Sequence, residues 1–224
     1  MASSTGGSEQ PRPAPPPATD LQVAKARQEL LEEFEQAHPG PTIERVFEES
    51  LAQFGDAAVP GYVATLGKRL ARDRLRALGQ VEGTIKREGP EVVFVGLEAR
   101  GRSQMATALT VIRSGGRVNA IAAGTHMTSE LDPNVIAAMA EIGIDLTDSH
   151  PKPLSREVLD AADVVVTLGR SVGRVELPPG KRHEDWRVGD PVGASLEEIR
   201  RIRRELELRV DELVAGLLAA GNGD

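Results

Sequence analysis

The hydrophobic pattern of the chain changes character at about residue 90. Beyond that point, short apolar runs alternate with amphipathic segments. Such runs are typical of strands buried on both faces of a parallel sheet, and the segments between them have helical spacing. The predicted strands cover 91–95, 118–122, 163–168 and 183–188, and the predicted helices start near Ser103 and cover 133–142, 155–162 and 195–218. This order predicts an α/β domain over 90–220, with an open four-stranded parallel sheet and helices on both faces.

Residues 20–80 have helical spacing only, in three amphipathic segments separated by proline and glycine. The first starts at Asp20, the second starts at Thr42 and the third covers 61–78, with Asp20 and Thr42 as candidate helix caps. A three-helix bundle of this size has a thin core, so it usually leans on a larger neighbour or on a second copy of itself. We therefore expect a small helical domain over 20–80, a linker over 80–90, and a homodimer or a protein partner.

Residues 1–19 hold five closely spaced prolines and few large apolar side chains, so they are predicted to form a disordered tail. The segment lacks the apolar stretch of a secretory signal, and no uncharged apolar run in the chain approaches the ~20 residues that cross a bilayer. A cytoplasmic protein without membrane contact is therefore expected.

The chain contains no cysteine, which excludes disulfides, thiolate zinc sites, iron–sulfur clusters and every protein thiol nucleophile. Its four histidines are scattered among predicted loops, so no metal and no cofactor is expected. The net charge of −7 makes nucleic acid an unfavoured partner. One helix segment is locally basic through Lys68, Arg69, Arg72, Arg74 and Arg76. A solvated helix face explains such a run most simply, and nucleic-acid contact is a weaker alternative.

The segment after the first predicted strand carries the strongest candidate chemistry. It comprises Gly96, Leu97, Glu98, Ala99, Arg100, Gly101, Arg102 and Ser103. A strand–loop–helix turn directs backbone N–H groups and the helix dipole at one point, which forms a seat for a tetrahedral oxyanion. Arg102 can clamp the anion, Gly101 lets the backbone approach it, and Ser103 is a candidate helix N-cap. By itself the pattern also fits an ordinary turn with surface arginines.

Several ordered blocks extend this candidate site along the chain. They are 93–95, Arg102-Ser103-Gln104-Met105-Ala106, 139–146, 151–154, 162–169, 179–182, Glu184-Asp185-Trp186 and Asp190-Pro191. With these blocks, the chain from residue 91 onward resembles the low-molecular-weight protein tyrosine phosphatase and arsenate reductase family, in its thioredoxin- or mycothiol-linked reductase branch. The segment 70–78 also resembles the three-helix domain that precedes this fold in some actinobacterial members.

The resemblance implies a site in which the first residue of the loop is not the family's cysteine. In the family the loop begins with a cysteine that attacks phosphorus or arsenic, followed six positions later by the arginine that holds the oxyanion and then by a serine. Gly96 occupies the cysteine position, whereas Arg102, Ser103 and Asp190, the family's general acid, match. Losing a nucleophile typically lowers the rate on the order of a millionfold. The resemblance therefore predicts no catalytic residue here, with Asp190 only a vestigial acid.

Two further departures weaken the family's chemistry. The family's loop asparagine and its serine partner on the second strand are Ala99 and Ala122 here. Where reductases carry resolving cysteines, this chain has Arg170 and Arg174, which removes the disulfide relay. These two arginines are instead expected to line the rim of the cleft and to focus a positive field on it.

We therefore expect a catalytically inactive relative that binds phosphate, sulfate, a phosphorylated small ligand or a partner protein through the loop 96–103. One alternative is a cysteine-independent phosphate-ester hydrolase that uses Asp190 and Arg102. Another is a regulator that contacts nucleic acid through the basic helix segment 68–76.

Overall fold

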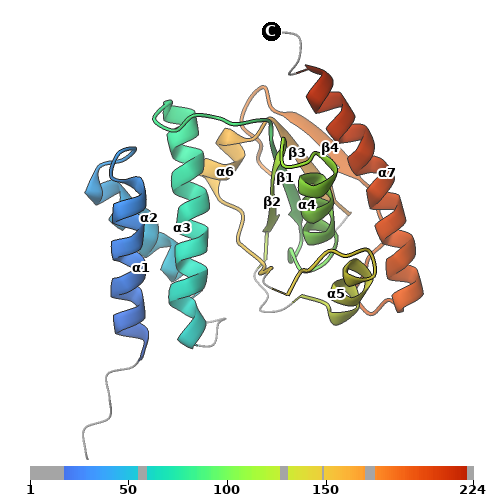
Figure 1. The fold of residues 1–224 in the computed structure, drawn as a ribbon, viewed down its shortest axis with the longest axis horizontal. Coiled ribbons are helices and arrows are strands. Elements are labelled where there is room, and N and C mark those ends of the chain that lie inside the picture. The colour runs from blue at the N-terminus through green and yellow to red at the C-terminus, as the bar shows by residue number, and fades with distance from the viewer. Residues whose placement is uncertain (1–17, 55–59, 127–130, 148, 170–174, 221–224) are drawn as a thin grey trace, which may run out of the picture.

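The computed structural model of the chain describes residues 18–54, 60–126, 131–147, 149–169 and 175–220. Three helices come first, namely α1 (Ala18–Phe34), α2 (Gly40–Ala52) and α3 (Pro60–Glu82). The other elements are β1 (Glu91–Gly96), α4 (Arg102–Arg113), β2 (Asn119–Gly124), α5 (Pro133–Ala140), α6 (Arg156–Ala161), β3 (Val164–Leu168), β4 (Arg182–Trp186) and α7 (Leu196–Ala220). Figure 1 shows the three N-terminal helices beside the α/β part.

Four parallel strands form one sheet in the order β2-β1-β3-β4, which confirms the predicted architecture. The chain leaves β1 through α4 toward β2 on one side, and it crosses back through α5 and α6 to β3 on the other. Connections that leave in opposite directions open a crevice beyond the carboxyl end of the central strand, where α/β sheets bind ligands. The loop after β1 lies at this crevice.

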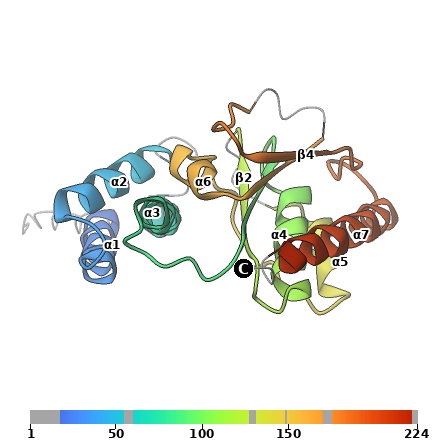
Figure 2. The same cartoon turned by 90° about the horizontal axis from the view of Figure 1, so that it is seen from above.

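Different helices cover the two faces of the sheet. On one face α4, α5 and α7 cover Phe94 of β1 and Trp186 of β4, whose rings lie 5.6 Å apart. The opposite face includes Val93 and is covered by α6 and by α3, whose Ala77 joins the same apolar cluster. Figure 2 shows α6 between α3 and the sheet. Because Leu75 of α3 lies in the core of the bundle, this one helix belongs to both hydrophobic cores.

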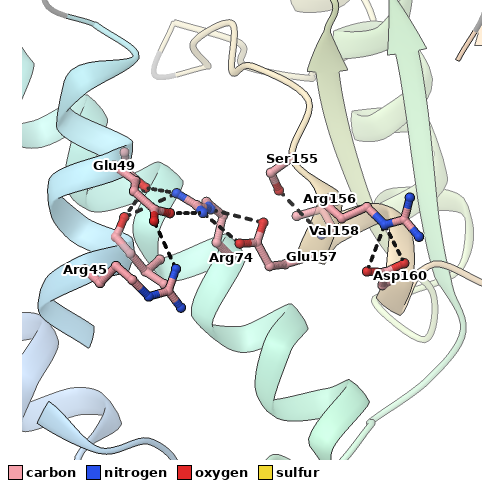
Figure 3. A network of polar contacts seen from close by, with 10 residues as sticks. Arg45, Glu49, Arg74, Ser155, Arg156, Glu157, Val158 and Asp160 are labelled. Carbon is pink, nitrogen blue, oxygen red and sulfur yellow. Dashed lines mark hydrogen bonds and ion pairs between the residues drawn. The ribbon is translucent and has the colours of Figure 1, made fainter. Parts of the chain in front are cut away.

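A buried arginine joins the N-terminal helices to the α/β part (Figure 3). Arg74 of α3 donates to Glu49 of α2 at 2.6 Å and to Glu157 of α6 at 2.7 Å. Its other terminal nitrogen donates to the Ser50 hydroxyl and the Val46 carbonyl. Burial is the largest single influence on the Glu157 carboxyl and would raise its pKa, but the hydrogen bond and the charge of Arg74, together with further hydrogen bonds at the helix start, lower the pKa overall. The hydrogen bond from Arg74 also lowers the pKa of Glu49.

Two helix starts differ from the sequence prediction. α1 begins at Ala18, so Asp20 lies in its first turn, where its charge favours the helix dipole, and not at the cap. α2 begins at Gly40, with Pro39 as the cap residue, so Thr42 is not the cap. Pro41, in the first turn, suits this start because the fixed φ of proline matches the helix and its missing N–H would have no partner there.

The end of α3 lies beyond the predicted one. The helix runs to Glu82, and Gly83 ends it with a φ of 77°. Gln80, predicted as the start of the linker, is instead buried and donates to the Glu91 carboxylate at 2.7 Å. The linker is therefore shorter than predicted.

Most of the predicted tail lies outside the described residues. Along the part of the chain that the structure describes, no helix has both the length and the apolar character needed to cross a membrane.

Candidate anion site

The loop after β1 directs its carbonyl groups toward flanking segments. The acceptors and their donors are Gly96 with Thr125 (3.2 Å), Leu97 with His126 (2.7 Å), Ala99 with the Gln104 side chain (3.0 Å), Arg100 with Asp132 (3.2 Å) and Gly101 with Met105 (3.0 Å). In a trans peptide, the N–H of the next residue points away from the carbonyl. The amides that follow these carbonyls therefore face the inside of the loop, as an anion seat at a helix start requires.

Ala99 adopts a backbone conformation that is unusual for a residue with a side chain. Its φ is 52°, in the left-handed region, which typically costs about 1–2 kcal/mol. The side chain of Gln104 holds this turn by donating to the Ala99 carbonyl, and it also donates to the His150 carbonyl at 3.3 Å. The sequence pattern alone did not assign this role to Gln104. A long polar side chain at a buried position of the helix start was the available signal.

Gly96 leaves room for a side chain inside the loop. A Cβ on Gly96 would lie 3.4 Å from Ser103 Oγ and 3.5 Å from the Ala99 nitrogen, which are ordinary contact distances. Ser103 is 1% exposed, and its Oγ has no hydrogen-bond partner among the described residues. The prediction that Ser103 caps α4 is wrong, because Gly101 takes the N-cap position without a side-chain hydrogen bond. The hydroxyl instead lies beside the place of the missing side chain.

Arg102 begins α4, and its side chain is only 10% exposed. Its Nη1 donates to the Val188 carbonyl at 3.0 Å and to the Gly189 carbonyl at 3.4 Å. Its Nη2 lies 3.4 Å from Asp190 Oδ2. A guanidinium carries five N–H donors and a full charge, so two neutral carbonyls and one long carboxylate contact leave Arg102 capacity for a further acceptor.

Gly169, directly after β3, gives the Arg102 guanidinium its space. Its φ is 88°, and a Cβ there would come within 2.5–2.9 Å of three guanidinium atoms. A larger residue would therefore displace Arg102. Gly169 was not among the predicted site residues, although a glycine that ends a strand at the same sheet edge was a usable signal.

The turn formed by Asp190 and Pro191 packs against the loop. A Cβ on Gly101 would come 2.6 Å from Pro191 Cγ, so Gly101 is required for this close approach. Asp190 Oδ1 accepts from the Val192 N–H at 3.2 Å, and the side chain is 53% exposed. Asp190 thus stabilises its own turn and lies beside Arg102.

Of the other arginines predicted at the site, one forms an ion pair and two lie outside the described residues. Arg100 forms an ion pair with Glu98, with 2.7 Å between Nε and Oε2. The predicted rim residues Arg170 and Arg174 lie outside the described residues.

The basic segment of α3 is compensated by acidic side chains. The ion pairs are Lys68 with Glu29 (2.5 Å), Arg72 with Glu33 (2.6 Å), Arg74 with Glu49 and Glu157, and Arg76 with Glu88 (3.8 Å). This pairing neutralises much of the charge that a phosphate backbone would need, so the structure does not favour the nucleic-acid alternative.

Histidines do not build a site in the described part of the chain. No group of three or more His, Asp or Glu side chains there could hold a metal ion. His38, predicted in a loop, is buried: its Nε2 lies 2.8 Å from the Leu75 carbonyl and its Nδ1 lies 3.4 Å from the Glu82 carboxylate. It therefore packs within the helical bundle.

The fold and the loop define a known class of protein. Residues 91–221 match the family model described as low molecular weight phosphotyrosine protein phosphatase. The match covers more than half of the chain, and the chain belongs to this family.

Similar individual proteins are arsenate reductases. The thioredoxin-dependent arsenate reductase Cg_ArsC1' of Corynebacterium glutamicum has a TM-score of 0.78 and 30% identity, over 88% of this chain and 97% of that one. This coverage includes N-terminal helices. The glutaredoxin arsenate reductase of Synechocystis is 34% identical over 129 residues, which are 56% of this chain and 96% of the relative. A structure described as an arsenate reductase in the phosphate binding state has a TM-score of 0.52 and 33% identity, over 57% and 98% of the two chains.

Proposed function

We propose that this protein is a catalytically inactive member of its family that binds an oxyanion or a phosphorylated ligand in the loop 96–103. The observation that carries the proposal is that Gly96 has no side chain at the nucleophile position, while the amides around it still face inward. The family's chemistry depends on a cysteine, and this chain has none. Losing a nucleophile lowers the rate on the order of a millionfold. The protein is therefore expected to bind the anion without converting it.

Three kinds of donor favour an anion in this loop. The N-terminus of α4 and the inward amides supply partial positive charge. The Ser103 hydroxyl is buried and meets no partner in the part of the chain that the structure describes, and a bound acceptor would remove that penalty of about 1–3 kcal/mol. Arg102 adds a full charge, which two neutral carbonyls and the long 3.4 Å contact with Asp190 balance only in part. Arg170 and Arg174 are expected to add charge at the rim.

These donors fit a tetrahedral oxyanion such as phosphate, sulfate or a phosphate monoester. The relative in the phosphate binding state supports this choice. A phosphorylated partner protein would present the same group. The homodimer stays a prediction, which light scattering can test. The helical bundle packs against the α/β part of its own chain, so it does not need a second copy to cover its core.

A second candidate is the cysteine-independent hydrolase, and one observation favours it. The Asp190 carboxylate is more than half exposed and lies beside Arg102, where it could take a proton from water that attacks a bound ester. We expect no turnover of p-nitrophenyl phosphate or of a nucleotide panel. Turnover that Arg102→Ala or Asp190→Ala abolishes would overturn the inactive assignment.

Restoring the missing sulfur gives the sharpest functional test. Because a Cβ fits at Gly96, Gly96→Cys would place a thiol next to the Ser103 hydroxyl and the inward amides, which favour its thiolate form. We expect hydrolysis of p-nitrophenyl phosphate to rise at least about a hundredfold over wild type. Gly96→Ala has the same Cβ without sulfur and should stay inactive. A folded Gly96→Cys variant that is no faster than Gly96→Ala would contradict a retained anion seat.

A further inference from the structure

We propose a second ligand site, a cavity that binds a compact primary amine at the opposite end of the sheet from the loop 96–103. The cavity has a volume of about 200 Å³ and lies between α3, α6 and the first residues of the edge strand β2. Its apolar wall includes Ala77, Val93, Ile121 and Val158. We call it the α3–β2 cavity. Because an apolar cavity of about 150 Å³ can hold benzene, this one has room for a body of that size with a short polar arm.

A buried carboxylate lies at the α3–β2 cavity. Glu91, the first residue of β1, lines the cavity and is 7% exposed. Its Oε1 accepts from Gln80 Nε2 of α3 at 2.7 Å and from Asn119 Nδ2 of β2 at 3.0 Å. Both amides donate to the same oxygen, and no donor from the described residues meets Oε2. The amides therefore orient the carboxylate and leave its second oxygen available to a donor in the cavity.

The charge of this carboxylate is not paired within the described part of the chain. The other charged residues of the lining have opposite charges nearby, because Asp73 pairs with Lys152 and Arg76 lies 3.8 Å from Glu88. No cationic side chain of the described residues forms an ion pair with Glu91. A buried charge is costly unless it is paired, so a bound cation would stabilise the protein. The apolar wall favours an organic cation over a metal ion, which requires oxygen ligands or water around it.

The open edge of β2 adds a backbone acceptor. Gly124 donates to the Lys152 carbonyl at 2.8 Å and accepts from the Leu154 N–H at 2.9 Å, so its peptide groups face the outer side of the sheet. In a parallel strand, every second residue directs its N–H and C=O to the same side. Ala120, four residues before Gly124, therefore presents its carbonyl at the outer edge, where it lines the cavity. An ammonium has three N–H donors, enough for the Glu91 carboxylate and this carbonyl.

The test titrates the full chain, near neutral pH, with benzylamine and with benzyl alcohol, which has nearly the same shape but no charge. Calorimetry is expected to show saturable binding of benzylamine with a dissociation constant of about 1 mM or lower. Benzyl alcohol should bind at least about tenfold more weakly, because charge-assisted hydrogen bonds are stronger than neutral ones. This pair of ligands tests the role of the charge without any variant.

Two variants locate the charge. Glu91→Gln keeps the shape of the side chain and should weaken benzylamine binding about tenfold or more. Glu82→Gln is the matched control, because it removes the same charge from a half-exposed side chain of α3 outside the cavity lining. It should leave the affinity unchanged. NMR of wild type should show that benzylamine shifts the backbone amides of residues 119–121.

Several results would overturn the α3–β2 cavity as an amine site. They are no saturable binding of benzylamine, equal affinity for benzyl alcohol, and unchanged affinity in a folded Glu91→Gln variant. Amide shifts confined to residues 97–103 would place the amine in the loop. Competition by an equal concentration of potassium chloride would assign the cavity to an inorganic cation. The ligand pair and the NMR shifts in wild type decide the question even if Glu91→Gln fails to fold.

Discussion

Two arginines of this chain are buried to the same extent but differ in how much negative charge surrounds them. The side chain of Arg74 is 11% exposed and that of Arg102 is 10% exposed. Arg74 donates to two carboxylates at 2.6 and 2.7 Å. Arg102 donates to two carbonyls, at 3.0 and 3.4 Å, and its nearest carboxylate oxygen, on Asp190, lies 3.4 Å away. Because a buried charge is costly unless it is paired, the first is compensated by the protein and the second is incompletely compensated. Arg74 thus joins parts of the fold, whereas Arg102 keeps the hydrogen-bonding capacity that the proposed anion site requires.

The largest expected effect is on stability, at Arg74. Arg74→Ala should lower the free energy of unfolding by about 3 kcal/mol, because Glu157 and Glu49 lose their partner at a packed interface. Urea unfolding measures the loss. Arg72→Ala removes a more exposed ion pair on the same helix and should cost at most about 1 kcal/mol. Equal losses for the two variants would show that the Arg74 contacts are not what joins the helices.

The pH dependence of stability sharpens the same contrast. The pKa of Glu157 is lowered in the folded state from an ordinary value of 4.5, so its ion pair stabilises the fold above that value. This contribution is lost as the pH falls through the folded pKa. We expect the free energy of unfolding of wild type to decline from about pH 5 to pH 3, and Arg74→Ala to decline less. Parallel pH profiles would contradict the assignment.

The smallest predicted effect concerns the strained loop. Ala99→Gly should raise the free energy of unfolding by about 1 kcal/mol, because glycine adopts a positive φ without the penalty of a Cβ. Thermal unfolding measures the change. Ala108→Gly, in the middle of α4, should instead lower it by about 1 kcal/mol. A loss of stability in Ala99→Gly would show that the Ala99 methyl contributes more than its backbone costs.

The strands β1 and β3 were predictable because local patterns determine them. The runs at β1 and β3 are apolar and β-branched, and both strands are buried throughout. The place of the loop followed from the rule that parallel sheets bind ligands beyond their carboxyl ends. The places of Gly96 and Arg102 in the loop were predictable from the family's spacing of six positions between the cysteine and the arginine. These features depend on neighbours in sequence or on general topology.

Long-range choices were not predictable. Arg74 and Glu157 are 83 positions apart, and no periodicity shows which of several basic residues on α3 turns inward. Ser103 has the residue type of an N-cap, but Gly101 already occupies that position. Gly169 meets Arg102 only because two strand ends lie at one edge of the sheet. Such contacts depend on the folded arrangement of several elements.

The central claim is that the loop still binds an anion that it does not convert. Its most direct test is an NMR titration of the wild-type chain with inorganic phosphate, observing the backbone amides of residues 97–103. The account predicts saturable shifts of these amides, lost in Arg102→Ala, retained in Arg72→Ala, and no hydrolysis of p-nitrophenyl phosphate by the same sample. Amides that do not respond to phosphate, or that respond equally without Arg102, would contradict it.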